Sequence, residues 1–341
     1  MKTKDFDYYL PEELIAQTPV YPRDSSRMLY YNRDKDEVLH KHFYDLADIL
    51  QPGDVLVRNN TRVLPARMFA YTTHGGKVEV LLLKRINLTD WEVLVKPGKK
   101  AKPNVKLIIN EELSLTVLGN YDESAGSRLV RFHFDGVFED IISRVGEMPL
   151  PPYITEKLSD SERYQTVYSK VNGSAAAPTA GLHFTEELIK KLQDNGVIIV
   201  DVLLHVGLGT FRPVKADDIS EHHMHSEYYE ISSESAQIIN KAKAEGRRVI
   251  AVGTTSIRTL ESVADENGFV KEQKGNTEIF LYPPYKFKCV DGCITNFHLP
   301  MSTLIMLISC FSSREKTLSL YEIAVKEGYR FFSFGDACLI L

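Results

Sequence analysis

Short alternating runs of apolar and polar residues between about residues 64 and 150 constrain the fold more than any other feature. The runs KVEVLLLK, WEVLVKP, KLIIN, LSLTVLG and RLVRFHF follow one another, and Gly, Pro, Asn and Asp separate them. A period of two is typical of half-buried strands, and closely spaced turns favour antiparallel pairing. This stretch therefore predicts a small antiparallel β-barrel or sandwich, which ends at the stiff segment MPLPPYI.

The segments on either side of this stretch show different secondary-structure patterns. Before residue 60, LPEELIAQ predicts a short helix with Pro11 in its first turn, and MLYYN and DVLVRNN predict strands. After residue 160, helix and strand patterns alternate. Since 341 residues suffice for two domains, we expect a discontinuous large domain at 1–63 and 151–341 with an inserted small β-barrel domain at 64–150. The expected class is α+β, with a central β-barrel-like sheet flanked by helices in the large domain.

Three segments carry polar residues just before a predicted helix. AAAPTAGLHF precedes the helix TEELIKKLQDNG, for which Thr185 is the expected N-cap. The buried strand RRVIAVG ends in Thr254, Thr255 and Ser256, after which the helix IRTLESVAD is expected to begin. The strand CITNF leads through the turn HLP to Ser302, the expected N-cap of the helix TLIMLISCF. We call each such polar segment, which lies directly before the N-terminus of a helix, an elbow. Its free backbone N–H groups and the dipole of the following helix are suited to binding a ligand.

Polar side chains also interrupt other apolar segments, namely VRNNTRVLPARM, LLHVGLGTFRPV, TNFHLPMST and YRFFSFGDA. Three of these segments have an alternative without a ligand: a turn with surface arginines for the first, a core histidine for the second, and an arginine stacked among aromatic rings for the last. We expect His183, Thr254 and Asn296 to line one cavity. The full set of candidate substrate-binding residues is Asn60, Thr61, Arg62, Arg67, Pro178, Thr179, Ala180, Gly181, His205, Thr210, Thr254, Thr255, Arg258, Thr295, Asn296, Ser302, Thr303 and Arg330.

The formal net charge of −5 argues against a generic polyanion binder, so contact with a nucleic acid requires a local basic patch. The segment KPGKKAKPNVK supplies one, because its Pro and Gly residues keep the lysines on a loop. A solvated charged hairpin is the alternative. The candidate tRNA-binding residues are Lys96, Lys99, Lys100, Lys102 and Lys106.

Generic catalytic motifs are missing from the sequence. It contains no Walker A sequence, no G-x-S-x-G elbow and no Gly-rich turn of an ordinary methyltransferase, and GLGTFRP lacks the third glycine of a dinucleotide fingerprint. His223 and His225 form an isolated H-x-H pair, which is more typical of a protein surface than of a metal site, so no metal is expected. The four cysteines, at 289, 293, 310 and 338, are expected to be free and mostly buried.

No segment suits a membrane. MKTKDFDYYLPEELIAQ has no apolar core region, and the apolar run LIMLISCF is too short to span a bilayer. The sequence therefore predicts a cytoplasmic protein.

Ten segments follow one another across nearly all of the chain: FDYYLPEELIAQTP, NNTRVLPAR, PLPPYI, RYQTVY, AAPTAGLHFT, HVGLGTFRPV, HHMHSE, AVGTTSIRTLE, DGCITNFHLPMSTLIML and YRFFSFGDA. Through them the chain resembles the S-adenosylmethionine:tRNA ribosyltransferase-isomerase family of queuosine biosynthesis. It departs from the family pattern at Pro284, Cys293, Met301 and Cys338.

The resemblance implies a monomeric enzyme without a permanently bound cofactor. Its cosubstrate would be S-adenosylmethionine, and its acceptor a tRNA with 7-aminomethyl-7-deazaguanine at the wobble position. Transfer and isomerisation of the ribosyl group would give epoxyqueuosine and release adenine and methionine. Two other functions stay open: a catalytically inactive tRNA-binding protein of this fold, and a conventional RNA methyltransferase.

The implied reaction needs a base, because the sulfonium acidifies the adjacent 5′ C–H. His183 is the favoured candidate, since the dipole of the following helix would keep its imidazole neutral beside a wall of small residues. His298 lies in an equally suitable elbow, and Asp336 and the acceptor amine are further candidates. A merely capping or packing role for His183 is the alternative.

Overall fold

The computed structural model describes residues 1–122, 126–156, 158, 160–207, 214 and 216–341. These residues form two compact units. The larger unit contains Met1–Arg62, Pro151–Val171 and Ala177–Leu341, and the smaller unit contains Val63–Leu150 and Asn172–Ala176. The strands β4 (Thr61–Val63) and β11 (Val171–Ser174) pair in a two-stranded sheet.

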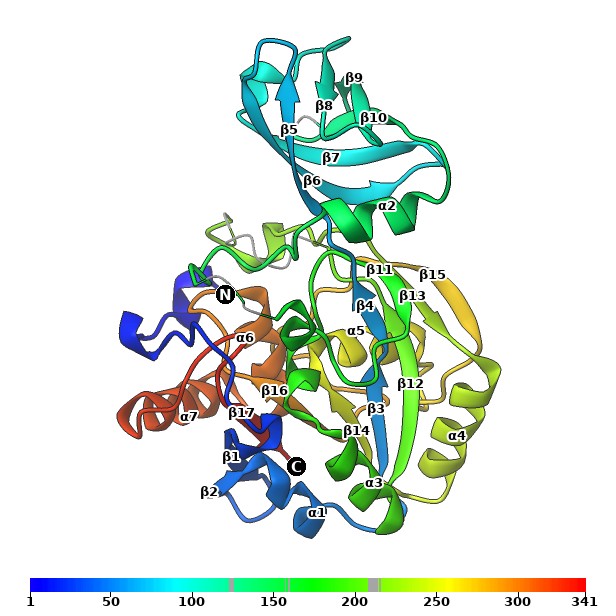
Figure 1. The fold of residues 1–341 in the computed structure, drawn as a ribbon. Coiled ribbons are helices and arrows are strands. Elements are labelled where there is room, and N and C mark those ends of the chain that lie inside the picture. The colour runs from blue at the N-terminus through cyan, green and yellow to red at the C-terminus, as the bar shows by residue number, and fades with distance from the viewer. Residues whose placement is uncertain (123–125, 157, 159, 208–213, 215) are drawn as a thin grey trace. The chain divides into compact units, whose positions relative to one another are not determined.

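A nine-stranded sheet forms the centre of the larger unit (Figure 1). Its middle strands β12, β3, β14 and β16 are parallel neighbours. All four residues of β14 are buried, which explains the uninterrupted apolar run VIAV in the sequence. In spatial order the strands are β15 (Gln273–Thr277), β13 (Glu227–Ile231), β12 (Ile198–Leu204), β3 (Val55–Asn59), β14 (Val249–Val252), β16 (Gly292–Asn296), β17 (Ala337–Ile340), β1 (Arg27–Asn32) and β2 (Glu37–His42).

Among the described residues, six α-helices accompany this sheet: α1 (Leu46–Ile49), α3 (Glu186–Asp194), α4 (Ser233–Ala244), α5 (Gly253–Val263), α6 (Thr303–Ile308) and α7 (Arg314–Lys326). α5 packs against β3, β12, β14 and β16. Leu46 of α1 and Leu188 and Leu192 of α3 share one buried cluster with Leu56 of β3 and Ile250 of β14. The helix α3 begins as predicted, since the Thr185 side chain accepts a hydrogen bond from Leu188 N.

The α+β class is confirmed, but the large sheet has two edges among the described strands, whereas the sequence predicts a more barrel-like sheet. The edge strand β15 reads QKGNT, and the other edge strand, β2, contains no fully buried residue. Polar edge strands of this kind remain open without recruiting another strand.

The smaller unit is a closed antiparallel barrel, as predicted. Inward side chains, among them Met68, Trp91 and Phe132, form its core. The sequence interpretation missed the helix α2 (Phe138–Val145), although Phe138, Ile141 and Ile142 have the spacing of one helix face. Around the barrel the strands are β10 (Arg128–His133), β7 (Asp90–Lys96), β6 (Lys77–Arg85), β5 (Arg67–Thr72), β8 (Lys106–Ile108) and β9 (Ser114–Asn120).

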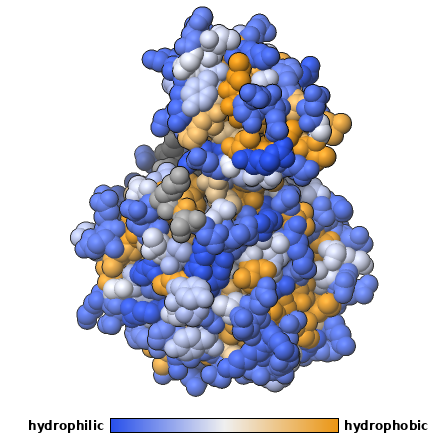
Figure 2. All heavy atoms as spheres, viewed as in Figure 1, coloured by the Kyte–Doolittle hydropathy of each residue, from blue (hydrophilic) through white to orange (hydrophobic). Residues whose placement is uncertain are grey.

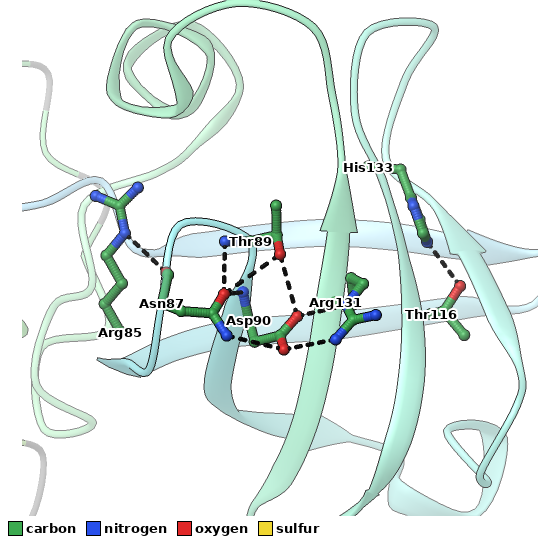
Figure 3. Close-up of polar contacts among 7 residues, drawn as sticks. All are labelled: Arg85, Asn87, Thr89, Asp90, Thr116, Arg131 and His133. Carbon is green, nitrogen blue, oxygen red and sulfur yellow. Dashed lines mark hydrogen bonds and ion pairs between the residues drawn. The ribbon is translucent and has the colours of Figure 1, made fainter.

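A buried carboxylate ties two barrel strands and a turn together (Figure 3). Asp90 of β7 accepts two hydrogen bonds from its cross-strand neighbour Arg131, at 2.7 and 2.8 Å, and others from Asn87 and Thr89. Asn87 in turn accepts from the backbone N–H groups of Thr89 and Asp90. The hydrogen bond from Arg131 is the main cause of the strongly lowered pKa of Asp90.

One predicted helix was wrong. LPEELIAQ forms only a 3-10 turn at Glu12–Leu14, with Pro11 as its N-cap. The backbone then pairs with a segment near the C-terminus, because Phe331 N donates to Leu14 O and Ala16 N donates to Phe331 O. This pairing replaces the hydrogen bonds that would extend the helix.

Figure 2 shows a mostly hydrophilic face of the larger unit with several hydrophobic patches, and hydrophobic residues also on the face of the smaller unit. The prediction of free cysteines is confirmed, with Cys289, Cys293 and Cys338 buried and Cys310 half-buried. No helix of the described residues has the length and apolarity that a membrane span requires.

Candidate functional site

Two of the predicted elbows meet because their strands are parallel neighbours. Val252 of β14 lies opposite Ile294 of β16, so the segments that follow these strands leave the same edge of the sheet. A cavity of about 80 Å³ that is partly open to solvent lies there. Nine predicted residues line it: Pro178, Thr179, Ala180, Thr254, Thr255, Thr295, Asn296, His298 and Ser302.

The elbow after β14 is tighter than predicted. Helix α5 begins at Gly253, whose φ of 81° favours glycine, so Thr254 and Thr255 lie in the first turn of α5. The Thr255 Oγ1 atom is buried and has no hydrogen-bond partner among the described residues. Ser256 is engaged inside the helix, since its hydroxyl donates to the Val252 carbonyl at 2.8 Å.

The elbow after β16 carries His298 into the cavity wall. His298 Nε2 lies 2.7 Å from Thr295 Oγ1, and within the described chain Nδ1 has no hydrogen-bond partner. Burial lowers the pKa of His298 to about 3, so its imidazole is neutral at pH 7. Ser302 caps α6 as predicted and accepts from Ile305 N, whereas Thr303, the first residue of α6, does not line the cavity.

A chain of hydrogen bonds runs from the cavity wall into the core. The Thr179 hydroxyl donates to Asn296 Oδ1 at 3.1 Å, and Asn296 Nδ2 lies 3.1 Å from His183 Nε2. His183 Nδ1 lies 2.7 Å from Ser26 Oγ, and the imidazole stacks on Phe43 with ring centroids 5.0 Å apart. Both ring nitrogens of His183 are therefore engaged within the protein.

The expectation that His183 lines this cavity was wrong. It ends the 3-10 helix at Thr179–His183 and lies behind Asn296, beside a separate small pocket. Its expected neutrality is supported, because the pKa falls to about 3, but for a different reason than the helix dipole. Burial is the main cause, and the charges of Arg330 and Arg23 add to it.

Asp336 and Arg330 stabilise a turn and do not line the cavity. Asp336 Oδ1 accepts from Arg27 N at 2.9 Å and Oδ2 accepts from Arg330 N at 2.8 Å, so both oxygens hold backbone groups. Burial raises the pKa of Asp336. The Arg330 guanidinium donates to the Thr18 carbonyl.

The same turn supplies cavity residues that the candidate set omits. Phe332 and Ser333 line the cavity, and Phe332 has a φ of 70°, a conformation that a bulky residue seldom adopts. The Tyr153 hydroxyl lies 2.7 Å from Ser333 Oγ, and the Tyr153 and Phe332 rings pack at 4.8 Å. Ser333 belongs to the segment YRFFSFGDA and Tyr153 to MPLPPYI, but no local pattern marks either as a cavity residue.

A second cluster lies at the carboxyl ends of β3 and β12. Thr61 Oγ1 lies 2.9 Å from His205 Nδ1, and burial lowers the pKa of His205. Arg62 donates to Ser169 Oγ and pairs with Glu162. Asn60 Oδ1 is buried without a partner among the described atoms. These four candidates do not line the cavity at β14 and β16.

Three further candidates have other surroundings. Gly181 gives Tyr168 space, since a Cβ at this position would lie 2.0 Å from the Tyr168 hydroxyl. Arg258 forms a nearly fully buried ion pair with Glu227. Thr210 lies outside the described residues.

The candidates in the smaller unit lie on the barrel. Arg67 of β5 pairs with Glu79 of β6 at 3.0 Å. Lys96 ends β7, Lys106 begins β8, and the other three lysines lie between them. Four of the five are exposed, and Lys100 is half-buried. No group of three or more His, Cys, Asp or Glu side chains suited to a metal ion occurs among the residues that the structure describes.

Similarity to known proteins extends along the entire chain. A family model described as queuosine biosynthesis protein matches residues 3–340. A protein from Carboxydothermus hydrogenoformans named S-adenosylmethionine:tRNA ribosyltransferase-isomerase is 58% identical, and the match covers 100% of both chains.

The chain belongs to the queuosine biosynthesis protein family.

A solved member of this family is also similar in structure. The crystal structure of S-adenosylmethionine tRNA ribosyltransferase from Thermotoga maritima matches with a TM-score of 0.58 and 38% sequence identity, over 99% of this chain and 100% of the other. The family resemblance stated from the ten segments is thereby confirmed.

Proposed function

We propose that this queuosine biosynthesis protein is an S-adenosylmethionine:tRNA ribosyltransferase-isomerase. It transfers and isomerises the ribosyl group of S-adenosylmethionine onto 7-aminomethyl-7-deazaguanine at the wobble position of tRNA. The products are epoxyqueuosine-tRNA, adenine and methionine. The observation that carries the proposal is the full-length match, at 58% identity, to a protein named for this activity.

The cavity at the ends of β14 and β16 suits the first step of this reaction. Removal of the acidified 5′ proton needs a neutral base in a site that excludes water. Ala177, Pro178, Leu299 and Leu304 supply apolar walls, and His298 is a neutral imidazole within them. We assign the role of the base to His298, whose Nδ1 takes the proton while Nε2 keeps its contact with Thr295.

The remaining cavity groups bind and orient the cosubstrate in this proposal. The first turn of α5 presents backbone N–H groups and the Thr254 side chain, which suit the carboxylate of the methionine part. Asn296 and Thr179 offer hydrogen bonds to a polar group of the nucleoside. The lysines of residues 96–106 bind tRNA phosphates.

The proposal also covers the acceptor, the cellular location, the oligomeric state and the roles of the two units. The acceptor is a tRNA that already carries 7-aminomethyl-7-deazaguanine, and the protein acts in the cytoplasm as a monomer with no permanently bound cofactor. The two compact units act as separate domains, a catalytic domain and a smaller tRNA-binding domain.

Product analysis tests the proposal. The protein is incubated with S-adenosylmethionine and a tRNA that carries 7-aminomethyl-7-deazaguanine. We expect adenine and methionine to appear in equal amounts, together with tRNA that gains the ribosyl-derived group. S-adenosylhomocysteine as the product would instead identify a methyltransferase, and tRNA binding without any turnover would identify an inactive RNA-binding protein.

A further inference from the structure

The outer face of the small barrel carries an exposed aromatic side chain between a cation and an aliphatic residue. Tyr71 of β5 lies opposite Lys77 of β6 and opposite Ile108 of β8. Residues directly opposite in antiparallel strands project from the same face. All three are exposed, with 43% of Tyr71 and 42% of Ile108 accessible to solvent.

On this face, no cation of the described chain covers the aromatic ring of Tyr71. Its neighbour Phe69 is covered, because Lys77 Nζ lies 3.8 Å from the centre of the Phe69 ring. Within the described residues, Tyr71 has no ring, cation or side-chain hydrogen-bond partner. An exposed tyrosine of this kind adds nothing to the barrel core, whose members are inward side chains.

The segment 96–106, here called the lysine loop, borders the same face. Residues 96–106 contain five lysines and no acidic residue, although the whole chain has a net charge of −5. Lys100 Nζ donates a hydrogen bond to the Lys77 carbonyl oxygen at 3.4 Å. It also lies close to Gly76, since a Cβ atom added at Gly76 would be 3.1 Å from Lys100 Nζ. The loop is therefore packed against the turn between β5 and β6, next to Lys77.

We propose that this face binds an unpaired nucleotide of the tRNA substrate, with its base stacked on Tyr71 and the adjoining phosphates on Lys77, Lys99 and Lys102. The inference rests on the proposed function and assigns part of the tRNA contact to this face. Proteins recognise single-stranded RNA by combining an aromatic stacking platform with a basic surface, and this face has both. The local excess of positive charge favours a polyanion over a protein partner.

Stacking and charge give separable signals in binding experiments. Tyr71→Ala should weaken tRNA binding by about 10-fold to 100-fold, with an unchanged salt dependence, because stacking releases no counterions. Tyr71→Phe should bind like the wild type. Lys99→Ala and Lys102→Ala should each make log K fall less steeply with log salt, by about 0.7–0.9 for each lost phosphate contact.

A matched control lies on the same barrel. Lys84, at the far end of β6 from Lys77, is also exposed and has no ion-pair partner within the described chain, so Lys84→Ala should leave the affinity for tRNA and the salt slope unchanged. The unfolding midpoint of each variant checks that the barrel is intact.

The outcomes separate this inference from the proposed function. If the wild type releases adenine and Tyr71→Ala binds tRNA as tightly as the wild type, the face does not stack a base and the inference is wrong. Equal effects of Lys84→Ala and Lys99→Ala would also overturn it, since the binding would then follow net charge alone. A wild type that binds tRNA but releases no adenine would contradict the proposed activity and leave the binding face intact.

Discussion

His298 and His183 are both neutral imidazoles near Asn296, but their surroundings give them different capacities. His298 lies in the cavity wall and keeps Nδ1 without a partner in the described part of the chain. His183 uses one nitrogen on Asn296 and the other on Ser26. The geometry thus suits His298 to proton transfer. His183 instead fixes the position of Asn296, which accepts a hydrogen bond from Thr179.

Exchanging each histidine for glutamine distinguishes these roles. His298→Gln should lower kcat on the order of 10²–10⁴-fold, the usual loss for a general base. His183→Gln should lower kcat by only about 10-fold to 100-fold, because the amide can still bond Asn296 and the loss is one of positioning. Steady-state kinetics with both substrates measures the two effects.

The pH profile provides the second readout. With the pKa of His298 near 3, the wild-type kcat/KM should show no loss from protonation of this base between pH 8 and pH 6. A positioning variant should keep the shape of this profile at a lower level. If His183→Gln abolishes turnover while His298→Gln retains it, the base assignment moves to His183.

Among the elements, parallel strands decide which elbows form one site. β14 and β16 are hydrogen-bonded neighbours, so Thr254 and Asn296 emerge at the same edge of the sheet. Thr61 and His205 also follow parallel strands, β3 and β12, but they bond to each other and lie outside this cavity. The order of the strands in the sheet therefore decides which polar residues share a cavity, and the sequence motifs alone do not.

The Asp90 cluster of the barrel gives a stability prediction (Figure 3). Asp90→Ala removes the acceptor for Arg131, Asn87 and Thr89, so it should lower the free energy of unfolding of the smaller unit by about 1–3 kcal/mol. Chemical denaturation followed by Trp91 fluorescence measures this, since Trp91 belongs to the barrel core.

A nearby hydrogen bond supplies the control. His133 and Thr116 also bond across two barrel strands, at 2.9 Å, but this pair is exposed. His133→Ala should therefore change the stability by less than about 0.5 kcal/mol. Equal losses in His133→Ala and Asp90→Ala would show that the buried carboxylate gives no special support to the barrel.

Local signals in the sequence predicted much of the fold. The caps Thr185 and Ser302 and five of the six barrel strands were predicted correctly, because capping and alternation depend on neighbouring residues. The strand β5 (Arg67–Thr72) was missed. The start of α5 was misplaced because the positive φ of Gly253 is a property of the folded backbone.

The sequence could not predict the surroundings of His183 or Phe332. The partner of His183 at Nδ1, Ser26, is 157 residues away in the chain, so no local pattern reveals that this histidine faces the core. Phe332 lines the cavity from the turn before β17, where its φ is 70°. Both features arise from tertiary contacts, which motif spacing does not encode.

At the scale of the whole molecule, buried neutral histidines make the stability depend on pH near neutrality. Burial lowers the folded-state pKa of His183 and of His298 to about 3, whereas an unfolded histidine titrates near 6.5. At these two histidines the unfolded chain therefore binds more protons than the folded chain below pH 6.5. The stabilisation is fully present above pH 6.5 and is lost progressively as the pH falls toward 3.

Replacing the fully buried histidine tests this dependence. In the wild type, the free energy of unfolding of the larger unit should fall between pH 6.5 and 5.5, with His183 contributing up to about 1.4 kcal/mol per pH unit. His183→Gln should be less stable at pH 7.5 but should show a shallower loss over this range, because glutamine takes up no proton. His223→Gln, which removes an exposed histidine of the same unit, should keep the wild-type slope. Denaturation curves at a series of pH values measure all three proteins, and identical slopes for the wild type and His183→Gln would mean that His183 is already protonated in the folded protein.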